Sequence, residues 1–322
     1  MIQKFLNKIL TTRIVIYLRI CVSIVFIIVI LNIPAQQKWD TDYNYEQLYW
    51  IILGTTLAFA CIALKTLKWH MLILSVEPKV KYKESIKSYL AGIPLSLLTP
   101  GRLGVISRIV FLPYKTLQGK IGVGSVFIDA FIDLLALFWW LPVGLYFFDP
   151  PLIILFLSTF IIALLSFVKY WIRYLTRMPF FFLLKYIYEK YQDVIQSLIN
   201  YPMFTPILLA VSSFGIEWLQ YWAFFNALAP VGIKVSLLQS ISVMLLVTFT
   251  NVFQISFAGI GVREGLSAFL LANHLPPTSA ALATFFVFFI DNAIPGLIGL
   301  FFKPVFQYNK DARTNSLQAS EA

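Results

Sequence analysis

Long apolar runs, separated by short polar or basic segments, dominate the hydrophobicity pattern of this chain. Six of the runs approach or exceed the length needed to cross a bilayer, which is about 20 mainly apolar residues. We place the six spans at residues 14–33, 49–67, 121–148, 152–168, 204–228 and 280–302. The pattern therefore predicts an all-α polytopic membrane protein with about six full transmembrane helices.

Two further apolar regions, residues 88–113 and 236–274, are interrupted near their middles, the first by proline and glycine and the second by glycine. In the first region, the apolar pieces on either side of the sequence TPGRLG are too short to cross about 30 Å of hydrocarbon. We therefore expect two re-entrant helical hairpins, which raises the number of hydrophobic regions to eight. The helix after each interruption should begin within two or three residues of Gly104 or Gly261.

Positive charges beside the predicted spans set the expected orientation, because cytoplasmic loops carry an excess of Lys and Arg. The N-terminus has Lys4, Lys8 and Arg13 ahead of the first span. We assign the segment after the second span to a basic cytoplasmic loop, whose lysines are Lys65, Lys68, Lys79, Lys81, Lys83 and Lys87. The first hairpin then enters from the cytoplasm and the second from outside. We expect both termini in the cytoplasm and the protein in the plasma (inner) membrane.

The two halves of the chain share a short pattern. TPGRLGVISR is followed by VFIDAFIDLL, and SFAGIGVREG is followed by FFIDNAIPGL, so that Asp129 aligns with Asp291. Because the two hairpins would open to opposite sides, the pattern predicts an inverted repeat, which is an architecture of transporters. The expected organisation is one transmembrane domain at residues 1–308, with halves at about 1–148 and 149–308, and a polar cytoplasmic tail at 309–322.

The composition agrees with lipid as the solvent of this chain. Hydrophobic residues make up 59% of its 322 residues, charged residues make up 12%, and the mean hydropathy is +0.80. Soluble domains are about 45–50% apolar and about 25% charged. The formal net charge of +10 fits basic cytoplasmic loops, so it needs no nucleic acid partner. Cys21 and Cys61 lie in apolar runs, where we expect them to be small buried side chains.

The interruptions bring glycine and arginine together inside apolar sequence. Non-helical backbone at this depth must be buried in protein or line a polar cavity, and the N-terminus of a broken helix attracts anions. Arginine can hold a phosphate with two parallel hydrogen bonds. The pattern therefore predicts a site for an anionic lipid headgroup. The residues expected at this site are Arg102, Arg108, Arg263, Gly101, Gly104, Gly259 and Gly261.

Carboxylates within the apolar regions are a second group of candidates, because they are costly in lipid and usually face partners or water. The charge partners that we expect are Asp129, Asp133, Glu217, Glu264 and Asp291. Asp129 and Asp133 are one helical turn apart and therefore lie on one face of a helix. Two interpretations stay open. The acids pair with the arginines to hold the hairpins, or one acid changes its protonation during a transport cycle.

The sequence contains none of the catalytic or metal-binding motifs that are typical of common enzyme classes. His70 and His274 are its two histidines, no His/Cys cluster fits zinc, and neither a P-loop nor a Gly-x-Ser-x-Gly elbow occurs. We therefore expect no enzyme activity, no metal and no cofactor. Three functions stay open: a lipid flippase or transporter, a membrane glycosyltransferase or its associated protein, and a non-transporting partner of a separate lipid-modifying enzyme. In each case the expected partners are membrane lipids.

At TPGRLGVISR and GIGVREG the chain resembles the membrane-domain, or flippase-like, family of lysylphosphatidylglycerol synthetases, and the resemblance covers nearly the whole chain. Asp133 matches the acidic position of a family span. The residues that match the two family motifs are Pro100, Gly101, Gly104 and Arg108 in the first, and Gly259, Gly261, Arg263 and Glu264 in the second. Three positions depart from the family pattern: Val105 replaces a usual glutamate, and Ala130 and Asn292 replace common arginines.

The resemblance implies lipid translocation, of aminoacylated phospholipids or of polyprenyl-linked intermediates. In two-domain relatives a soluble aminoacyl transferase follows the membrane part. This chain ends at Ala322, about twenty residues after the last predicted span. We therefore expect a stand-alone member without the soluble synthase domain, which does not itself make lysyl-lipid. The lost charges at the three departing positions put into question whether the first hairpin binds the same ligand.

Overall fold

The computed structural model describes residues 45–114, 116–118, 120–146, 204–253 and 259–304. All regular secondary structure in this part is helical, which confirms the prediction of an all-α fold for the described residues. The helices, in chain order, are α3 (Tyr45–Leu74), α4 (Tyr82–Leu98), the 3₁₀ helix η1 (Pro100–Phe111), α5 (Lys120–Tyr146), α9 (Phe204–Ala227), α10 (Leu237–Phe253), α11 (Val262–Leu270), α12 (Pro277–Phe288), the π turn η4 (Phe289–Ala293) and α13 (Ile294–Leu300).

Four helical segments are long and apolar enough to cross a membrane, and all four correspond to predicted spans. They are Tyr45–Leu74, Ile121–Gly144, Phe204–Ala227 and Pro277–Leu300. The predicted spans 14–33 and 152–168, the predicted boundary between the two halves and the tail at 309–322 lie outside the described residues. The total of six spans and the inverted repeat therefore stay predictions.

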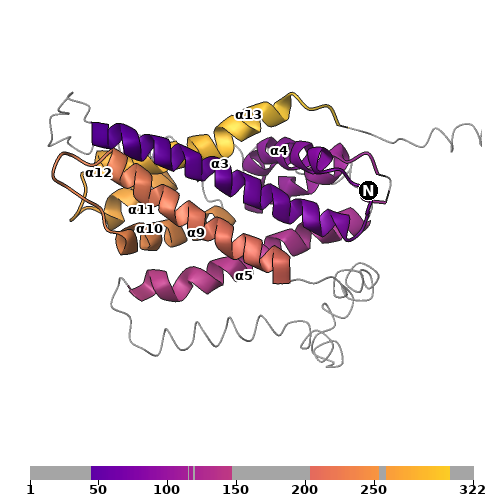
Figure 1. The fold of residues 1–322 in the computed structure, drawn as a ribbon, viewed down its shortest axis with the longest axis horizontal. Coiled ribbons are helices and arrows are strands. Elements are labelled where there is room, and N and C mark those ends of the chain that lie inside the picture. The colour runs from indigo at the N-terminus through magenta and orange to yellow at the C-terminus, as the bar shows by residue number, and fades with distance from the viewer. Residues whose placement is uncertain (1–44, 115, 119, 147–203, 254–258, 305–322) are drawn as a thin grey trace, which may run out of the picture.

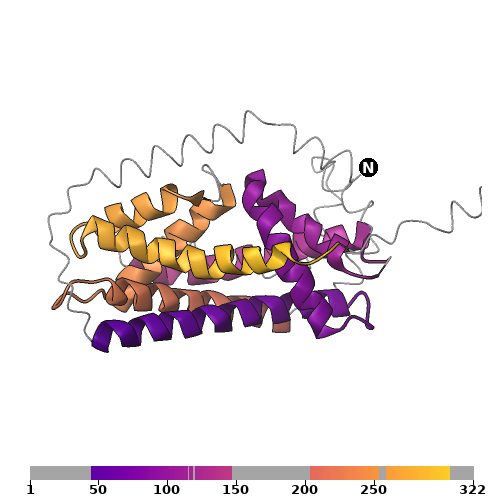
Figure 2. The same ribbon diagram turned by 90° about the horizontal axis from the view of Figure 1, so that it is seen from above.

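Helices α3 and α9 lie side by side and antiparallel along most of their lengths (Figures 1 and 2). Gly54 of α3 leaves room for the Phe224 ring of α9, because a Cβ at this position would lie 2.9 Å from the ring. The main buried apolar cluster lies beside this pair. It joins α5, α9, α10 and α12 through residues such as Ile132, Phe214 and Met244.

The first interrupted region folds into two helices that pack on one another, α4 and η1, joined at Thr99; we call them the first hairpin. Thr99 has an extended conformation, and its hydroxyl oxygen accepts a hydrogen bond from the N–H of Gly104 at 2.5 Å. A Cβ at Gly104 would lie 2.0 Å from the carbonyl oxygen of Leu95, so only glycine allows this approach. The second helix begins at Pro100, which is earlier than expected, because the fixed φ of proline suits the first position of a helix.

The second interrupted region contains α10 and α11, with residues 254–258 between them outside the described part. Gly259 and Gly261 have φ values of 77° and 87°, which side chains other than glycine rarely adopt. Helix α11 begins at Val262, directly after Gly261, which confirms the expected start. Glycine therefore shapes the backbone at both interruptions, by close packing at the first and by conformation at the second.

The last span is one helical segment with a wide turn in it. The π turn η4 separates α12 from α13 and contains Asp291 and Asn292. Beyond it, α13 packs against α4 of the first hairpin, where a Cβ at Gly299 would lie 2.2 Å from the carbonyl oxygen of Leu90. The C-terminal half of the chain thus contacts the first interrupted region directly.

The prediction that a basic loop begins directly after the second span is wrong for its first residues. Helix α3 continues to Leu74, so Lys65 and Lys68 are helical residues. Lys68 is 1% exposed and the neighbouring Trp69 is fully buried. His70, also in α3, has its Nδ1 2.8 Å from the hydroxyl of Ser85. Both lysines point into the protein because carboxylates inside it compensate their charge.

Candidate functional site

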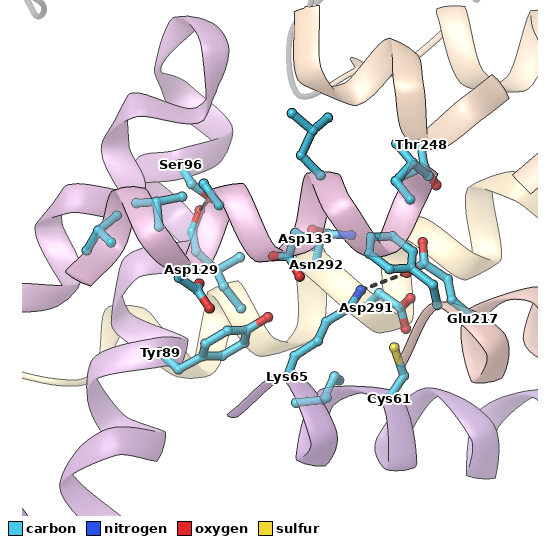
Figure 3. Close-up of a pocket in the computed structure, with 18 of the residues that line it drawn as sticks. Cys61, Lys65, Tyr89, Ser96, Asp129, Asp133, Glu217, Thr248, Asp291 and Asn292 are labelled. Carbon is cyan, nitrogen blue, oxygen red and sulfur yellow. Dashed lines mark hydrogen bonds and ion pairs between the residues drawn. The ribbon is translucent and has the colours of Figure 1, made fainter. Parts of the chain in front are cut away.

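A cavity of about 510 Å³ lies inside the described helices, between α3, α5, α9 and the last span (Figure 3). The first hairpin, α10 and α11 also contribute to its walls. Most wall residues are apolar, but ionisable side chains of both signs project between them. Those of Lys, Arg, Asp and Glu are Lys65, Arg108, Asp129, Asp133, Glu217, Arg263 and Asp291. Such groups are rare inside a membrane protein, which makes this cavity the candidate functional site.

One side of the cavity is held by a chain of four charged residues. Asp129 accepts from Arg108 Nη1 at 2.8 Å and lies 2.8 Å from Lys68 Nζ. Lys68 also contacts Asp133, so that two cations and two anions alternate. The chain joins η1, α5 and α3. The Asp129 side chain is 5% exposed and that of Asp133 is 36% exposed, so Asp133 is the end that faces the open space.

Arg108 is also held by its surroundings. Its guanidinium lies 4.2 Å from the centre of the Tyr89 ring, over the ring face, which is a favourable cation–π arrangement. Gly92 on α4 leaves room for it, because a Cβ there would lie 2.3 Å from Cγ of Arg108. Its Nε has no hydrogen-bond partner among the described residues. A positioned arginine that keeps one donor available is suited to bind an anion in the cavity.

The other side of the cavity holds a second, smaller charge group. Lys65 of α3 contacts Glu217 of α9, with 2.7 Å between Nζ and Oε2. Asp291, in the π turn, accepts a hydrogen bond of 2.9 Å from the side-chain amide of Gln220. Among the described residues, Asp291 forms no ion pair. Figure 3 shows Glu217 and Asp291 on one side of the cavity, beside the end of the Lys65 side chain.

Arg263 lies in the first turn of α11 and is 2% exposed. Its Nε donates to the carbonyl of Gly259 at 3.3 Å, and its guanidinium lies 4.0 Å from the centre of the Phe288 ring. The adjacent Glu264 is directed elsewhere, since its carboxylate accepts from the N–H of Gly261 at 2.6 Å. That contact closes the first turn of the helix, and Glu264 is not part of the cavity wall.

The structure brings together two of the three predicted arginines, Arg108 and Arg263, at one cavity. The third, Arg102, lies in η1, but its side chain is outside the described part, and Gly101 is its neighbour in the same helix. Gly104, Gly259 and Gly261 shape the two interruptions and do not line the cavity. A headgroup-binding role for all these residues stays a prediction.

The predicted contact between an acid and an arginine is present at Asp129 and Arg108, whereas the other predicted charge partners contact other groups. In the described part, only Asp129 contacts one of the predicted arginines. Asp133 and Glu217 contact lysines, Asp291 contacts an amide, and Glu264 contacts backbone. The interior cations that sequence reasoning missed are Lys65 and Lys68. A signal for them was present, because residues 65, 68, 69 and 72 follow helical spacing and fall on one face of a continuing helix.

The cavity wall also contains the three positions at which this chain departs from the family pattern. Val105, Ala130 and Asn292, where the family resemblance leads us to expect charged residues, all line this cavity. No group of three or more His, Cys, Asp or Glu side chains in the described residues is placed to hold a metal ion. Cys61 is a buried free thiol in the wall, as expected for a small apolar side chain.

Comparison with known proteins places the chain in a family. Searches of curated proteins and of solved structures each found no match. The family model described as the lysylphosphatidylglycerol synthase TM region matches residues 16–299, a range that includes both interruptions and every residue of the cavity wall. The resemblance seen in the two glycine motifs is thereby confirmed, and this chain belongs to the family of the lysylphosphatidylglycerol synthase TM region.

Proposed function

We propose that this integral membrane protein is a lipid flippase or transporter, which moves the headgroup of an anionic lipid across the bilayer. The observation that carries the proposal is the meeting of Arg108 and Arg263 at one cavity. The two arginines are 155 residues apart in the chain, and each follows a glycine interruption. Membership of a lipid-related membrane family supports the same function.

The size and chemistry of the cavity support a headgroup rather than a whole lipid as its occupant. Acyl chains are already in their preferred solvent, so only the polar head needs a charged path through the protein. A volume of about 510 Å³ has room for such a head. The proposed substrates are an anionic or aminoacylated phospholipid, or a polyprenyl-phosphate-linked lipid. Arginine would bind the phosphate that they share, and the acidic wall residues would accept an ammonium group.

The proposed mechanism uses the two interruptions as re-entrant hairpins that meet from opposite sides. An inverted repeat would let the two halves exchange which side of the cavity is open. In this scheme six spans surround the hairpins, and both termini lie on the cytoplasmic side of the plasma membrane. The protein acts as a carrier and not as an enzyme, and it works without a metal or cofactor.

A second candidate function is supported by the three departing positions. Val105, Ala130 and Asn292 line the same cavity, so this chain has lost expected charges at the proposed site itself. A protein that no longer moves lipid, but serves as the partner of a separate lipid-modifying or glycosyl-transferring enzyme, would tolerate such losses. This candidate predicts that the purified protein moves no lipid.

Reconstitution separates the two candidates. The purified full chain is inserted into liposomes that contain fluorescent phosphatidylglycerol, and loss of the label from the inner leaflet is followed with a membrane-impermeant quencher. We expect faster headgroup movement than in protein-free liposomes, and a strong reduction for Arg263→Ala at equal protein incorporation. Movement by Arg263→Ala at the parent rate would show that the proposed site is wrong. No movement by the parent, with a polyprenyl phosphate tested as well, would favour the partner function.

A further inference from the structure

Lys65 is held less firmly than the other interior lysine. Its ammonium contacts one carboxylate, that of Glu217, and its side chain is 23% exposed. Lys68 contacts two carboxylates and its side chain is 1% exposed. Because a buried cation can leave a carboxylate only if another anion replaces it, the lysine with one carboxylate and an open side is the one able to exchange partners.

The position of Lys65 in the cavity allows this exchange. Its side chain extends from α3 into the space between Asp133 and Glu217 (Figure 3). The ammonium also lies over the ring of Phe214, with 5.6 Å between Nζ and the ring centre, and this neutral ring does not compensate the charge as a carboxylate does. An ammonium has three N–H donors, and Glu217 Oε2 occupies one of them. A phosphate oxygen in the cavity could accept from another.

Glu217 and Asp291 depend on this same lysine. Asp291 has the amide of Gln220 as its hydrogen-bond partner, and the charged groups that act on it are Glu217, Lys65 and Arg263. Arg263 is held on its own side by Gly259 and Phe288. If Lys65 turned to another anion, two neighbouring carboxylates would remain in a desolvated site. Without that cation, a desolvated carboxylate beside a like charge favours its protonated form. Asp291, whose hydrogen-bond partner is the amide of Gln220, is the acid placed to take up the proton.

From this geometry we infer that Lys65 binds the lipid phosphate by leaving Glu217, and that Asp291 takes up one proton from water as it does so. The inference rests on the proposed function of the cavity. Charge balances in this step, since a phosphodiester brings one negative charge and the proton brings one positive charge. The titratable groups that face Lys65 and the two acids are Cys61 of α3, Tyr89 of α4, Asp133 of α5, Tyr221 of α9 and Arg263 of α11.

Binding to the full chain in detergent micelles tests the inference. The probe is dihexanoyl-phosphatidylglycerol, titrated by calorimetry in two buffers of different ionisation enthalpy, which gives the number of protons taken up. We expect about one proton for each lipid bound by the parent. Because binding takes up a proton, the affinity should fall by up to about tenfold for each unit by which the pH is raised. Inorganic phosphate is titrated separately, and binding of phosphate but not of the lipid would overturn the lipid as the ligand.

Four variants make the test specific. Lys65→Met should weaken binding about tenfold or more, since it removes a charge-assisted hydrogen bond to phosphate. Lys65→Arg should stay within about threefold of the parent because it keeps the charge, and Lys87→Met, an exposed lysine of α4, should match the parent. The double variant Glu217→Gln, Asp291→Asn should bind at least as tightly as the parent but without proton uptake, because Lys65 then has no carboxylate to leave.

Several results would overturn the inference: no lipid binding by the parent, parent-like binding by Lys65→Met, or unchanged proton uptake by the double variant. If the Lys65–Glu217 ion pair were purely structural, Lys65→Met and the double variant Glu217→Gln, Asp291→Asn would both weaken binding. The inference and the proposed function fail separately. A parent that shows proton-linked binding yet moves no lipid in liposomes contradicts transport only. A Lys65→Met variant that moves lipid at the parent rate contradicts the role of Lys65 only.

Discussion

Lys68 and Asp129 form an ion pair inside the protein, with 2.8 Å between Lys68 Nζ and Asp129 Oδ1 and less than a tenth of either side chain exposed. Asp129 also contacts Arg108, and Lys68 also contacts Asp133. The pair therefore connects α3 and α5 to the first hairpin. Arg108 is thereby linked to α5 directly and to α3 through Asp129, which restricts the position of its guanidinium.

Replacing Lys68 by methionine should destabilise the protein strongly. Methionine fills the space of the lysine chain, but Asp133 then loses its ion-pair partner and Asp129 keeps Arg108 alone. Removing one partner from a buried ion pair typically costs about 3–5 kcal/mol. The apparent Tm of the detergent-solubilised protein, followed by tryptophan fluorescence, should fall clearly, while Lys87→Met, at an exposed position, should leave it unchanged. An unchanged Tm for Lys68→Met would contradict the importance of the charge chain.

Gly104→Ala should separate α4 from η1. The added methyl group would lie 2.0 Å from the carbonyl oxygen of Leu95, and backbone cannot give way as a flexible side chain does. Overpacking of this kind costs about 1–3 kcal/mol. Gly296→Ala is the matched control, since its methyl group would lie 3.4 Å from the Ile93 side chain of the same α4 helix. Thermal unfolding of both variants measures the difference, and equal Tm values would argue against close packing at Gly104.

Arg263→Lys should recover only part of the transport that Arg263→Ala loses. Lysine keeps the charge but loses the planar fork, which lies over Phe288 and donates to Gly259. We expect Arg263→Ala to move lipid about tenfold more slowly than the parent or worse, with Arg263→Lys between them. Lys81→Ala, on an exposed residue ahead of α4, should behave as the parent. Equal rates for the lysine and alanine variants would show that charge at this position does not matter.

The expected orientation can be tested at two exposed residues. Lys81 precedes α4, and Val231 lies between α9 and α10; the two loops are at opposite ends of the molecule in Figure 1. In a background with Cys21 and Cys61 replaced by serine, Lys81→Cys should react with an impermeant maleimide only from the cytoplasmic side. Val231→Cys should react only from outside. Labelling of both residues from one side would reject the assigned topology.

The glycine interruptions and the two cavity arginines could be predicted from sequence because each rests on local information. A glycine in an apolar run marks a close approach or an unusual backbone angle within a few residues of itself. Thus α11 begins where Gly261 indicates, and Arg108 and Arg263 share a cavity. The prediction that the two arginines share one cavity required a further assumption, namely that both interruptions contribute to the same site.

The prediction that Lys65 and Lys68 lie in a cytoplasmic loop is wrong because the carboxylates that compensate their charges are far away in the sequence. The carboxylate partner of Lys65 is 152 residues away in the chain, and one partner of Lys68 is 65 residues away. Counting Lys and Arg near span ends treats each as a loop residue, since an unpaired lysine in lipid is costly. Only the packing of α3 against α5 and α9 removes that cost. The same limit applies to Asp291, whose amide partner Gln220 has no signature in the sequence.

The π turn at Phe289–Ala293 changes the rotation of α13 about the helix axis relative to α12. A π turn has one residue more than an α-helical turn, and each residue of an α-helix turns it by about 100°. Deleting one residue there would restore a regular helix, but it would rotate Asp291 against Gly299 by about that angle. The carboxylate could then face Gln220, or the glycine could fit against Leu90, but one continuous α-helix could not do both. Single-residue insertions and deletions in this span should therefore be far less tolerated than substitutions of its lipid-facing residues.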